Sequence, residues 1–538
     1  MLKLVLGASG SGKTTLLYAR IRARAEAGKR SILLVPEQFT SSTEARIYRE
    51  LGDALSGMVE SYSFTSLAEH ILAALGGAAV QTLTDAGRAV LVRRALEELQ
   101  DNVHYYYRHR RSAAFCQMAA ETIDELKSAG LSGQQLQELA RDCGTESAKL
   151  GELALIFQGY ESLLAGTGMD PADRLELAAD RLEAALARDE LPDFLREREV
   201  FIDEFDTFNA PKKRLMGAML AALPAVTVAL CEDGAPMQPG DLELFSGAKQ
   251  VAAQLRQLAR KNGAQVAAPE LLRRDLRHKD APGLAALTEL LETGSCTPPE
   301  SASELRLFAA ASREEEARCA AAAIRRLMRQ GVRCGKIAVV CRDISLYRAA
   351  VRYEFRMAEI PLYCDEPTTP EFSAPATAVR ALLALLRGAD MTEQLTVLAK
   401  TGLCGLTEPE VCALENYAYT WSPNAAAWRA EFTKSPRGFG DAELTEEDTL
   451  NLTRAENARK KLVTAVDTLR SKVRSANAEQ ISRAMLARGF SGRIPEGVSE
   501  RPAWKMRDTL FLAVWCSALI LLRLCRPAEN LSMLINNL

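Results

Sequence analysis

The amino-acid sequence predicts an α/β fold, in which a parallel sheet with large helical insertions is followed by a second, partial α/β lobe and a helical region. Three observations lead to this prediction. Short apolar runs alternate with helical patterns over the first part of the chain. Similar runs return near residue 200, and each is as short and as uniformly apolar as a strand of a parallel sheet. Between residues 84 and 190 the periodicity is almost wholly helical.

The first strand, expected at Leu2–Leu6, leads into the most specific motif of the chain. Residues 7–14 read Gly-Ala-Ser-Gly-Ser-Gly-Lys-Thr, a complete G-x-x-x-x-G-K-T phosphate loop, and a helix is expected from Lys13 to Ala27. In this arrangement the glycines let backbone N–H groups surround phosphate oxygens, and the positive N-terminal end of the helix points at the same anion. The alternative is a chance glycine turn between a strand and a helix.

The motif predicts that the chain binds a nucleoside triphosphate, ATP, together with Mg²⁺. Lys13 is expected to reach the β- and γ-phosphates, and the Thr14 hydroxyl is expected to hold the metal ion. The nucleotide-binding residues predicted from the motif are Gly7, Ala8, Ser9, Gly10, Ser11, Gly12, Lys13, Thr14 and Thr15.

The rest of the first domain follows in order. A second strand is expected at Ser31–Val35, with a helix from about Ser42. After the helical insertion, strands are expected again at Glu199–Ile202 and Ala225–Leu230, so that the sheet resumes there.

A second α/β unit is expected where apolar runs at residues 305–308 and 336–341 flank a helix from about Glu314 to Gln330. We therefore expect four regions: a nucleotide-binding domain at 1–80 and 195–300, a helical insertion at 81–194, a second lobe at 301–368 and a helical region at 369–538.

Two adjacent carboxylates, Asp203 and Glu204, follow the strand that ends at Ile202. Successive strand side chains point to opposite faces, so the two carboxylates can take different roles. Beside a phosphate loop, Asp203 is expected to complete the Mg²⁺ shell, and Glu204 is expected to orient and deprotonate the attacking water. The alternative for Glu204 is a carboxylate that caps the following helix.

The overall composition is neutral on partners. Lys and Arg number 67 against 70 Asp and Glu, so any nucleic-acid site must be a local groove. Twelve cysteines without a C-x-x-C pair, and only four histidines, argue against zinc fingers and a disulfide framework and favour reduced thiols in the cytoplasm. The apolar stretch from Thr509 to Cys525 is at the short limit for a membrane span and is expected to be a buried helix, so no membrane partner is predicted.

Four segments resemble, in this order, the first half of a superfamily 1, UvrD-like DNA helicase: the phosphate loop and residues 35–46, 61–72 and 202–205. More narrowly, they resemble AddB, also called RexB, the second subunit of the bacterial AddAB helicase-nuclease. This narrower resemblance rests on the N-terminal phosphate loop, on Pro36-Glu37-Gln38, on the Ser-Phe pair at residues 63–64, and on the segments 337–347 and 360–365. It covers nearly the whole chain and implies a RecA-like fold for both lobes.

By this resemblance, two segments match the motifs that contact single-stranded DNA. Hydroxyls and backbone amides at helix starts bind phosphates, and aromatic rings stack on bases. The alternative is that the aromatic residues belong to the core and that the hydroxyls cap helices. The DNA-binding residues implied are Phe39, Thr40, Ser61, Tyr62, Ser63 and Phe64.

Arg342 follows the second expected strand of the second lobe. It matches the arginine that approaches the γ-phosphate of the nucleotide in this family, a charge-stabilising role that the guanidinium group suits. The alternative is an ordinary surface arginine after a strand.

The resemblance implies ATP-dependent unwinding and resection of double-strand DNA ends for recombinational repair. In such a complex an AddA-type subunit provides the main motor, and this part binds single-stranded DNA. The chain departs from a working motor at two places. No adenine-recognition glutamine precedes Gly7, and residues 231–234, Cys-Glu-Asp-Gly, replace the element that couples nucleotide state to DNA. The alternatives are an autonomous superfamily 1 translocase and a structural scaffold that binds ATP without turnover.

The chain is also expected to be an N-terminal portion. It ends at Leu538, before the later motor motifs and before the C-terminal nuclease domain and iron-sulfur cysteines of AddB-type subunits, so no iron-sulfur ligand is assigned among its residues. The pair Asp203-Glu204 is nevertheless a fuller acidic pair than is expected of AddB, where the glutamate is often replaced, so hydrolysis stays open.

One further cluster, residues 104–111, reads His-Tyr-Tyr-Tyr-Arg-His-Arg-Arg and lies within the predicted helical insertion. Interleaved aromatic and basic side chains can stack bases and bind phosphates. The alternative is a solvated helix end or loop with half-buried tyrosines.

Overall fold

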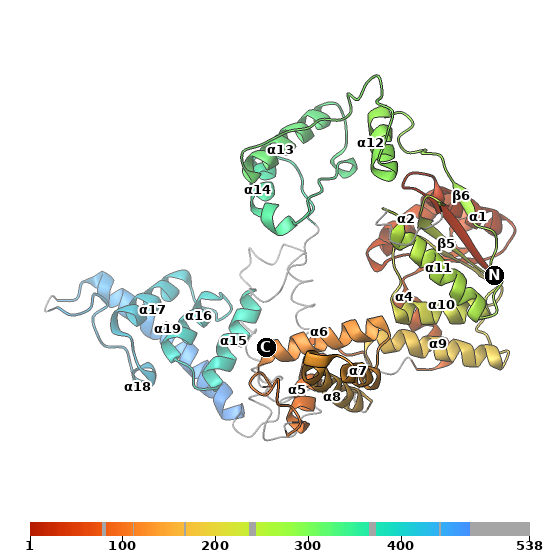
Figure 1. Cartoon of the computed structure of the whole chain (residues 1–538). Helices are drawn as coiled ribbons and strands as arrows, with labels where there is room; N and C mark the ends of the chain where they lie inside the picture. The colour runs from red at the N-terminus through yellow and green to blue at the C-terminus, as the bar shows by residue number, and fades with distance from the viewer. Residues whose placement is uncertain are drawn as a thin grey trace. The chain divides into compact units, whose positions relative to one another are not determined.

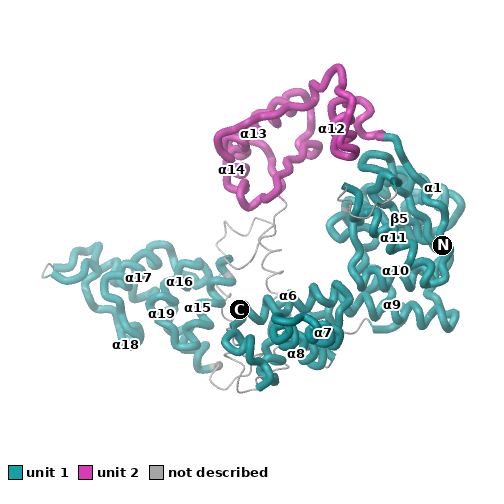
Figure 2. Tube along the Cα trace, viewed as in Figure 1, with its two compact units in different colours: residues 1–274, 371–538 teal, residues 275–370 magenta. Residues whose placement is uncertain are grey.

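A computed structural model describes residues 1–77, 82–99, 101–110, 112–165, 168–235, 244–364, 373–440 and 443–473. The chain divides into two compact units: residues 275–370 form one, and residues 1–274 with 371–538 form the other (Figure 2). The apolar stretch at residues 509–525 lies outside the described residues. Within the described ranges, no helix is both long enough and apolar enough to traverse a bilayer.

The first unit contains a six-stranded sheet with the order β3-β2-β4-β5-β1-β6, in which all neighbouring strands are parallel (Figure 1). Gly7 pairs in register with Cys231, and Leu34 pairs with Ile202. The segments that follow these strands therefore leave the sheet at one edge, the carboxyl-terminal edge where α/β sheets bind ligands. The strands are β1 (Leu2–Gly7), β2 (Ser31–Leu34), β3 (Val59–Tyr62), β4 (Glu199–Ile202), β5 (Ala225–Cys231) and β6 (Glu270–Leu272).

Helices cover both faces of this sheet. On one face, α4 (Phe64–Leu75), α9 (Pro171–Ala187), α10 (Ala210–Ala222) and α11 (Ser246–Lys261) share a core with Val200 of β4. On the other face, α1 (Lys13–Glu26) and α2 (Thr40–Leu51) share a core with Phe201. Neighbouring strand residues thus point to opposite cores, which is why these strands read as continuous apolar runs. The short elements η1 (Glu37–Phe39) and α3 (Asp53–Ser56) flank α2.

A helical insertion lies between β3 and β4 in the chain (Figure 1). Its helices pack around a separate core that includes Phe115, Phe157 and Tyr160. The buried Lys127 ammonium lies 2.8 Å from the carboxylates of both Asp170 and Asp173, which ties the insertion to the start of α9 and so to the sheet. The elements of the insertion are α5 (Asp85–Glu98), α6 (Ala113–Ala129), α7 (Gly133–Arg141), η2 (Gly144–Glu146) and α8 (Ser147–Leu164).

A second helical region follows residue 372. Its core surrounds the fully buried Trp428, whose indole N–H donates to the Thr392 hydroxyl at 2.9 Å. The helices are α15 (Ala374–Leu386), α16 (Met391–Lys400), α17 (Glu408–Trp421), α18 (Ala425–Arg429) and α19 (Glu446–Val473).

The second unit differs from the sequence-based expectation. It contains α12 (Pro282–Thr293), α13 (Arg313–Arg329), η3 (Cys334–Lys336) and α14 (Ile344–Met357), and α13 packs on α14 around Phe355. The strands expected at 305–308 and 336–341 are not formed in its described residues. A strand requires a neighbour to pair its N–H and C=O groups. Neither segment has one among the described residues, and Leu307 and Val340 are 99% and 91% exposed.

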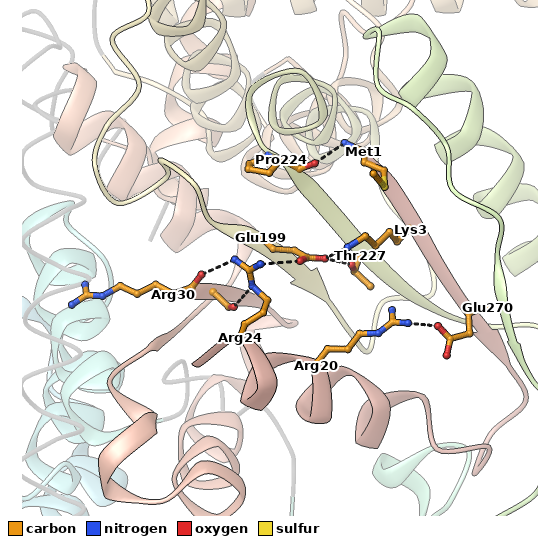
Figure 3. Close-up of polar contacts among 10 residues, drawn as sticks. Met1, Lys3, Arg20, Arg24, Arg30, Glu199, Pro224, Thr227 and Glu270 are labelled. Atoms are coloured by element: carbon orange, nitrogen blue, oxygen red, sulfur yellow. Dashed lines mark hydrogen bonds and ion pairs between the residues drawn. The ribbon is translucent and has the colours of Figure 1, made fainter. Parts of the chain in front are cut away.

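The amino end of the sheet is held by a buried carboxylate. Glu199 Oε1 accepts hydrogen bonds from Lys3 Nζ at 2.8 Å and from the Thr227 hydroxyl at 2.9 Å, and Glu199 Oε2 lies 3.3 Å from the Arg24 guanidinium (Figure 3). Arg24 also donates to the Ser31 hydroxyl at 3.1 Å. This network ties β1, β2, β4, β5 and α1 together at the end of the sheet opposite to the phosphate loop.

Candidate nucleotide site

The phosphate loop has the backbone that its glycines predict. Gly10 and Gly12 adopt φ angles of 82° and 91°, a region that residues with a Cβ atom rarely occupy. At Gly7, a Cβ atom would lie 2.4 Å from the Ser11 hydroxyl and 2.7 Å from the Leu272 carbonyl oxygen. The loop therefore closes tightly over the end of β1 and delivers the chain to the first turn of α1.

The N-terminal turn of α1 is left open to an anion. Its N-cap residue, Gly12, provides no side-chain hydrogen bond, and the first turn contains no acidic residue. The Lys13 ammonium bends over the loop and donates to the carbonyl oxygens of Gly7 and Ala8 at 2.7 and 2.8 Å. Ser11 is only 5% exposed, and its hydroxyl has no hydrogen-bond partner among the described residues. A buried polar atom of this kind beside backbone N–H donors fits a phosphate-binding loop.

Asp203 lies at the end of β4, on the same edge of the sheet as the loop. Its backbone N–H donates to the Leu34 carbonyl oxygen at 3.1 Å, and the residue is 5% exposed. The Thr14 hydroxyl donates to the Asp203 carboxylate, so the two residues expected to hold Mg²⁺ lie in contact. Burial raises the pKa of Asp203 above its ordinary value, and the hydrogen bonds from Thr14 and from the Glu204 N–H oppose this rise.

Glu204 follows in an unusual backbone conformation. Its φ is 64°, in the left-handed region that non-glycine residues rarely adopt, and its N–H donates to Asp203 Oδ1 at 3.0 Å. The side chain is turned to solvent at the mouth of the site. Partial desolvation and the Asp203 carboxylate raise the pKa of Glu204, and the Arg46 guanidinium opposes them. Strained residues of this kind cluster at functional sites.

Arg46 and Tyr18 complete the site, although the sequence analysis gave neither a role. The Arg46 guanidinium lies 4.9 Å from the centre of the Tyr18 ring and acts electrostatically on both Asp203 and Glu204. Burial raises the pKa of Tyr18 to about 12, and Arg46 opposes the shift. The available signal was periodicity, because Arg46 lies one residue before the buried Ile47 on α2, at the border of its apolar face.

Comparison with known proteins identifies the family. A family model described as "ADDB, N-terminal" matches residues 4–288, which is just over half of the chain. The chain belongs to this AddB N-terminal family. It is also similar to curated proteins that are named as one of the subunits of an "ATP-dependent helicase/deoxyribonuclease".

Three such relatives show how far the similarity extends. The chain is 32% identical to one from Desulforudis audaxviator over 79% of the chain and 37% of the relative. It is 31% identical to one from Moorella thermoacetica over 80% and 38%, and 27% identical to one from Clostridium perfringens over 87% and 41%. The chain thus spans about two fifths of the length of these relatives.

The segments that match DNA-contacting motifs of the AddB family lie at the same edge of the sheet. Phe39 ends η1 after β2 and is 37% exposed, and the Thr40 hydroxyl donates to the Glu37 carbonyl oxygen at 3.0 Å. Both side chains lie at the start of α2, where they are accessible to a ligand.

The segment after β3 is more occupied by internal contacts. Ser63 caps α4 through a reciprocal pair of hydrogen bonds with Ser66, and Phe64 is 2% exposed, with its ring against Phe205 and Phe208. The Tyr62 hydroxyl donates to Glu60 at 2.9 Å. Ser61 lies on β3, paired with Leu33. These contacts place the Phe64 ring in the core, as the alternative stated for the aromatic residues has it, so the accessible candidates for DNA contact at this edge are Phe39 and Thr40.

Arg342 lies in the second unit, exposed, two residues before α14. The segment before it is not a strand in the described residues, so the local feature from which its role was expected is absent there. The role of Arg342 at the nucleotide stays a prediction.

Proposed function

We propose that this chain is the helicase-like, ATP- and single-stranded-DNA-binding part of an AddAB-type helicase-nuclease that acts in double-strand break resection and recombinational DNA repair. Membership of the AddB N-terminal family and the names of the curated relatives support the DNA-processing role. The contact between Thr14 and Asp203 is the observation that carries the nucleotide-binding part of the proposal. An AddA-type subunit in the cytoplasm is the proposed partner, and the ends of double-stranded DNA are the proposed substrate.

The residues present fit a magnesium nucleotide. A hydroxyl and a carboxylate oxygen are ligands that Mg²⁺ takes when it also binds substrate phosphates. Thr14 and Asp203 would hold the ion, and the open first turn of α1 with Lys13 would hold the phosphates. When bound, the ion supplies charge stabilisation for phosphoryl transfer.

Glu204 has the properties of a general base for hydrolysis. Its carboxylate is accessible, adjoins the proposed metal ligand and has a raised pKa, which brings its proton affinity closer to that of a useful base at neutral pH. Arg46 supplies a positive charge beside both carboxylates. The chain's own residues can therefore bind the triphosphate, orient a water molecule and accept its proton.

The direct test is ATP hydrolysis by the purified chain, with and without single-stranded DNA. We expect turnover that rises with DNA, and a loss of about 10² to 10⁴-fold in Glu204→Gln, the usual contribution of a general base. Glu197→Gln is the matched control, because Glu197 is also an exposed glutamate with a positive φ, of 59°, at the other end of the same strand. Tight ATP binding without turnover would instead support the structural scaffold.

A further inference from the structure

An exposed aromatic and basic surface lies in the helical insertion, between α5 and α6. We propose that Tyr105, Tyr107, Arg108 and Arg110, called here the tyrosine-arginine surface, bind single-stranded DNA by stacking bases and contacting phosphates. This inference rests on the proposed function in taking DNA as the ligand, but it assigns a site separate from the sheet edge where Phe39 and Thr40 lie.

The backbone under this surface is held by one carboxylate. Glu152 Oε1 accepts the N–H groups of His104 and Tyr105 at 2.7 and 2.6 Å, and Oε2 accepts the Tyr106 N–H at 3.1 Å. Glu152 is 9% exposed, and a carboxylate so buried is stable only when its oxygens are hydrogen-bonded. The next turn closes with the His109 N–H donating to the Tyr106 carbonyl oxygen at 2.9 Å. The segment is therefore fixed before any ligand binds, which lowers the entropic cost of binding.

The three consecutive tyrosines have different environments. Tyr106 packs inward, with its ring centre 5.0 Å from that of Phe115 in the core of the insertion. Tyr105 and Tyr107 point outward and are 59% and 52% exposed. The core anchor thus orients two neighbouring rings toward solvent, where each can offer a face to a base.

The basic residues lie beside these rings. The Arg110 guanidinium lies 3.8 Å from the centre of the Tyr107 ring, a cation–π contact that holds the ring and keeps the charge at the surface. Arg108 is exposed. The acidic groups nearby are engaged, because Glu152 accepts three N–H groups and Glu146 lies 3.6 Å from Lys149. The surface is therefore positive and aromatic together, which matches the phosphates and unstacked bases of a single strand better than a duplex.

The test measures the affinity of the full chain for a fluorescent oligonucleotide of about twenty thymidines, longer than the 4 to 16 nucleotides that a typical single-strand site covers. We expect the double variant Tyr105→Ala, Tyr107→Ala to bind about tenfold more weakly or worse, since two base stacks are lost. The double variant Arg108→Ala, Arg110→Ala is expected to reduce the salt dependence of binding by about 1.4, two phosphate contacts at about 0.7 each.

Two single variants serve as controls. Tyr353→Ala removes a tyrosine on α14 with the same exposure as Tyr105, 59%, and Arg329→Ala removes an exposed arginine on α13. Neither is expected to change the affinity. Far-ultraviolet circular dichroism and ATP binding of each variant report whether it has folded, and we expect both to equal those of the parent chain.

The outcomes separate this inference from the proposed function. Unchanged affinity in both double variants, with DNA still bound by the parent chain, would overturn the tyrosine-arginine surface and leave the proposed function standing. No DNA binding by the parent chain would overturn both. If the double variants keep their DNA affinity but lose a protein partner, the surface is a protein-docking site and the inference is wrong.

Discussion

The Thr14 hydroxyl donates a hydrogen bond to the Asp203 carboxylate, although the two residues belong to segments that lie far apart in the sequence. The contact follows from the sheet order, in which only β5 separates β1 from β4. Parallel strands bring the loop after β1 and the carboxylate after β4 to one edge. A metal-binding hydroxyl and a metal-binding carboxylate therefore meet over the open first turn of α1.

Replacing Asp203 by Asn is expected to separate function from stability. The pKa of Asp203 is raised in the folded chain, mainly by burial, so ionisation of this carboxyl disfavours folding. The stability that its protonated form contributes is present below the unfolded pKa and is lost as the pH rises through the folded pKa. At pH 8, Asp203→Asn should therefore unfold at an equal or higher urea concentration than the parent chain when no nucleotide is bound.

The same variant should lose the stabilisation that magnesium ATP gives. At one hundred times its dissociation constant, a ligand adds about 2.7 kcal/mol to the free energy of unfolding. We expect this increment in the parent chain and in Asp206→Asn, an exposed control nearby, but not in Asp203→Asn. An Asp203→Asn protein that is stabilised by magnesium ATP as fully as the parent would remove Asp203 from the site.

Arg46→Ala should make hydrolysis more sensitive to acid. The Arg46 charge opposes the raised pKa values of Asp203 and Glu204, so its removal lets both rise further. We expect the acidic limb of the pH profile of hydrolysis to move to higher pH, and Arg46→Lys to restore it in part. Arg49→Ala, an exposed position on the same helix, is the control. An unchanged pH profile in Arg46→Ala would mean that this charge does not act on the catalytic carboxylates.

Glu199→Gln should destabilise the fold without changing nucleotide affinity. Breaking a buried ion pair costs about 3 to 5 kcal/mol, and Glu199 also loses its charged hydrogen bonds from Lys3 and Thr227. Burial alone raises the pKa of Glu199, but these hydrogen bonds and the charges of Lys3 and Arg24 outweigh burial and lower it.

The pH dependence of Glu199→Gln follows from this lowered pKa. The contribution of Glu199 is fully present above the unfolded pKa and is lost as the pH falls through the folded pKa. The difference in unfolding free energy between Glu199→Gln and the parent should thus be largest near neutral pH and shrink below about pH 4, close to the ordinary pKa of a glutamate. Urea unfolding at several pH values measures it, and a difference that grows in acid would contradict the account of this network.

Glu152→Gln should loosen the backbone of the tyrosine-arginine surface. An amide group provides one acceptor oxygen in place of two and turns an N–H group toward backbone donors, at a cost of about 1 to 3 kcal/mol for unsatisfied groups. Hydrogen exchange at His104, Tyr105 and Tyr106 should become faster, while exchange in the β-strands stays unchanged. Equal protection of these three amides in both proteins would show that other contacts hold the segment.

The sequence predicted the elements whose signals are local. The phosphate loop, α1 and β4 follow from a motif, a cap pattern and an apolar run that ends in carboxylates. In contrast, β3 was not predicted as a strand, because Val59–Tyr62 contains two polar residues, and β6 has only three residues in a polar passage.

Features that depend on distant partners were beyond the sequence. The runs at 305–308 and 336–341 have the composition of strands, but pairing decides whether a strand forms, and no partner is present among the described residues. Phe64 followed the family motif yet packs against Phe205 and Phe208, which its own segment does not reveal. Likewise, the role of Arg46 depends on the approach of α2 to the end of β4.

Binding of magnesium ATP to the purified chain, measured by titration calorimetry, tests most directly whether the loop from Gly7 to Thr15 is the nucleotide site. The parent chain and Lys29→Ala, which removes an exposed lysine just beyond the far end of α1, should bind one ATP with equal affinity. Lys13→Ala should bind it far more weakly, because the ammonium that reaches the β- and γ-phosphates is gone. Equal binding by Lys13→Ala and the parent chain would contradict the account.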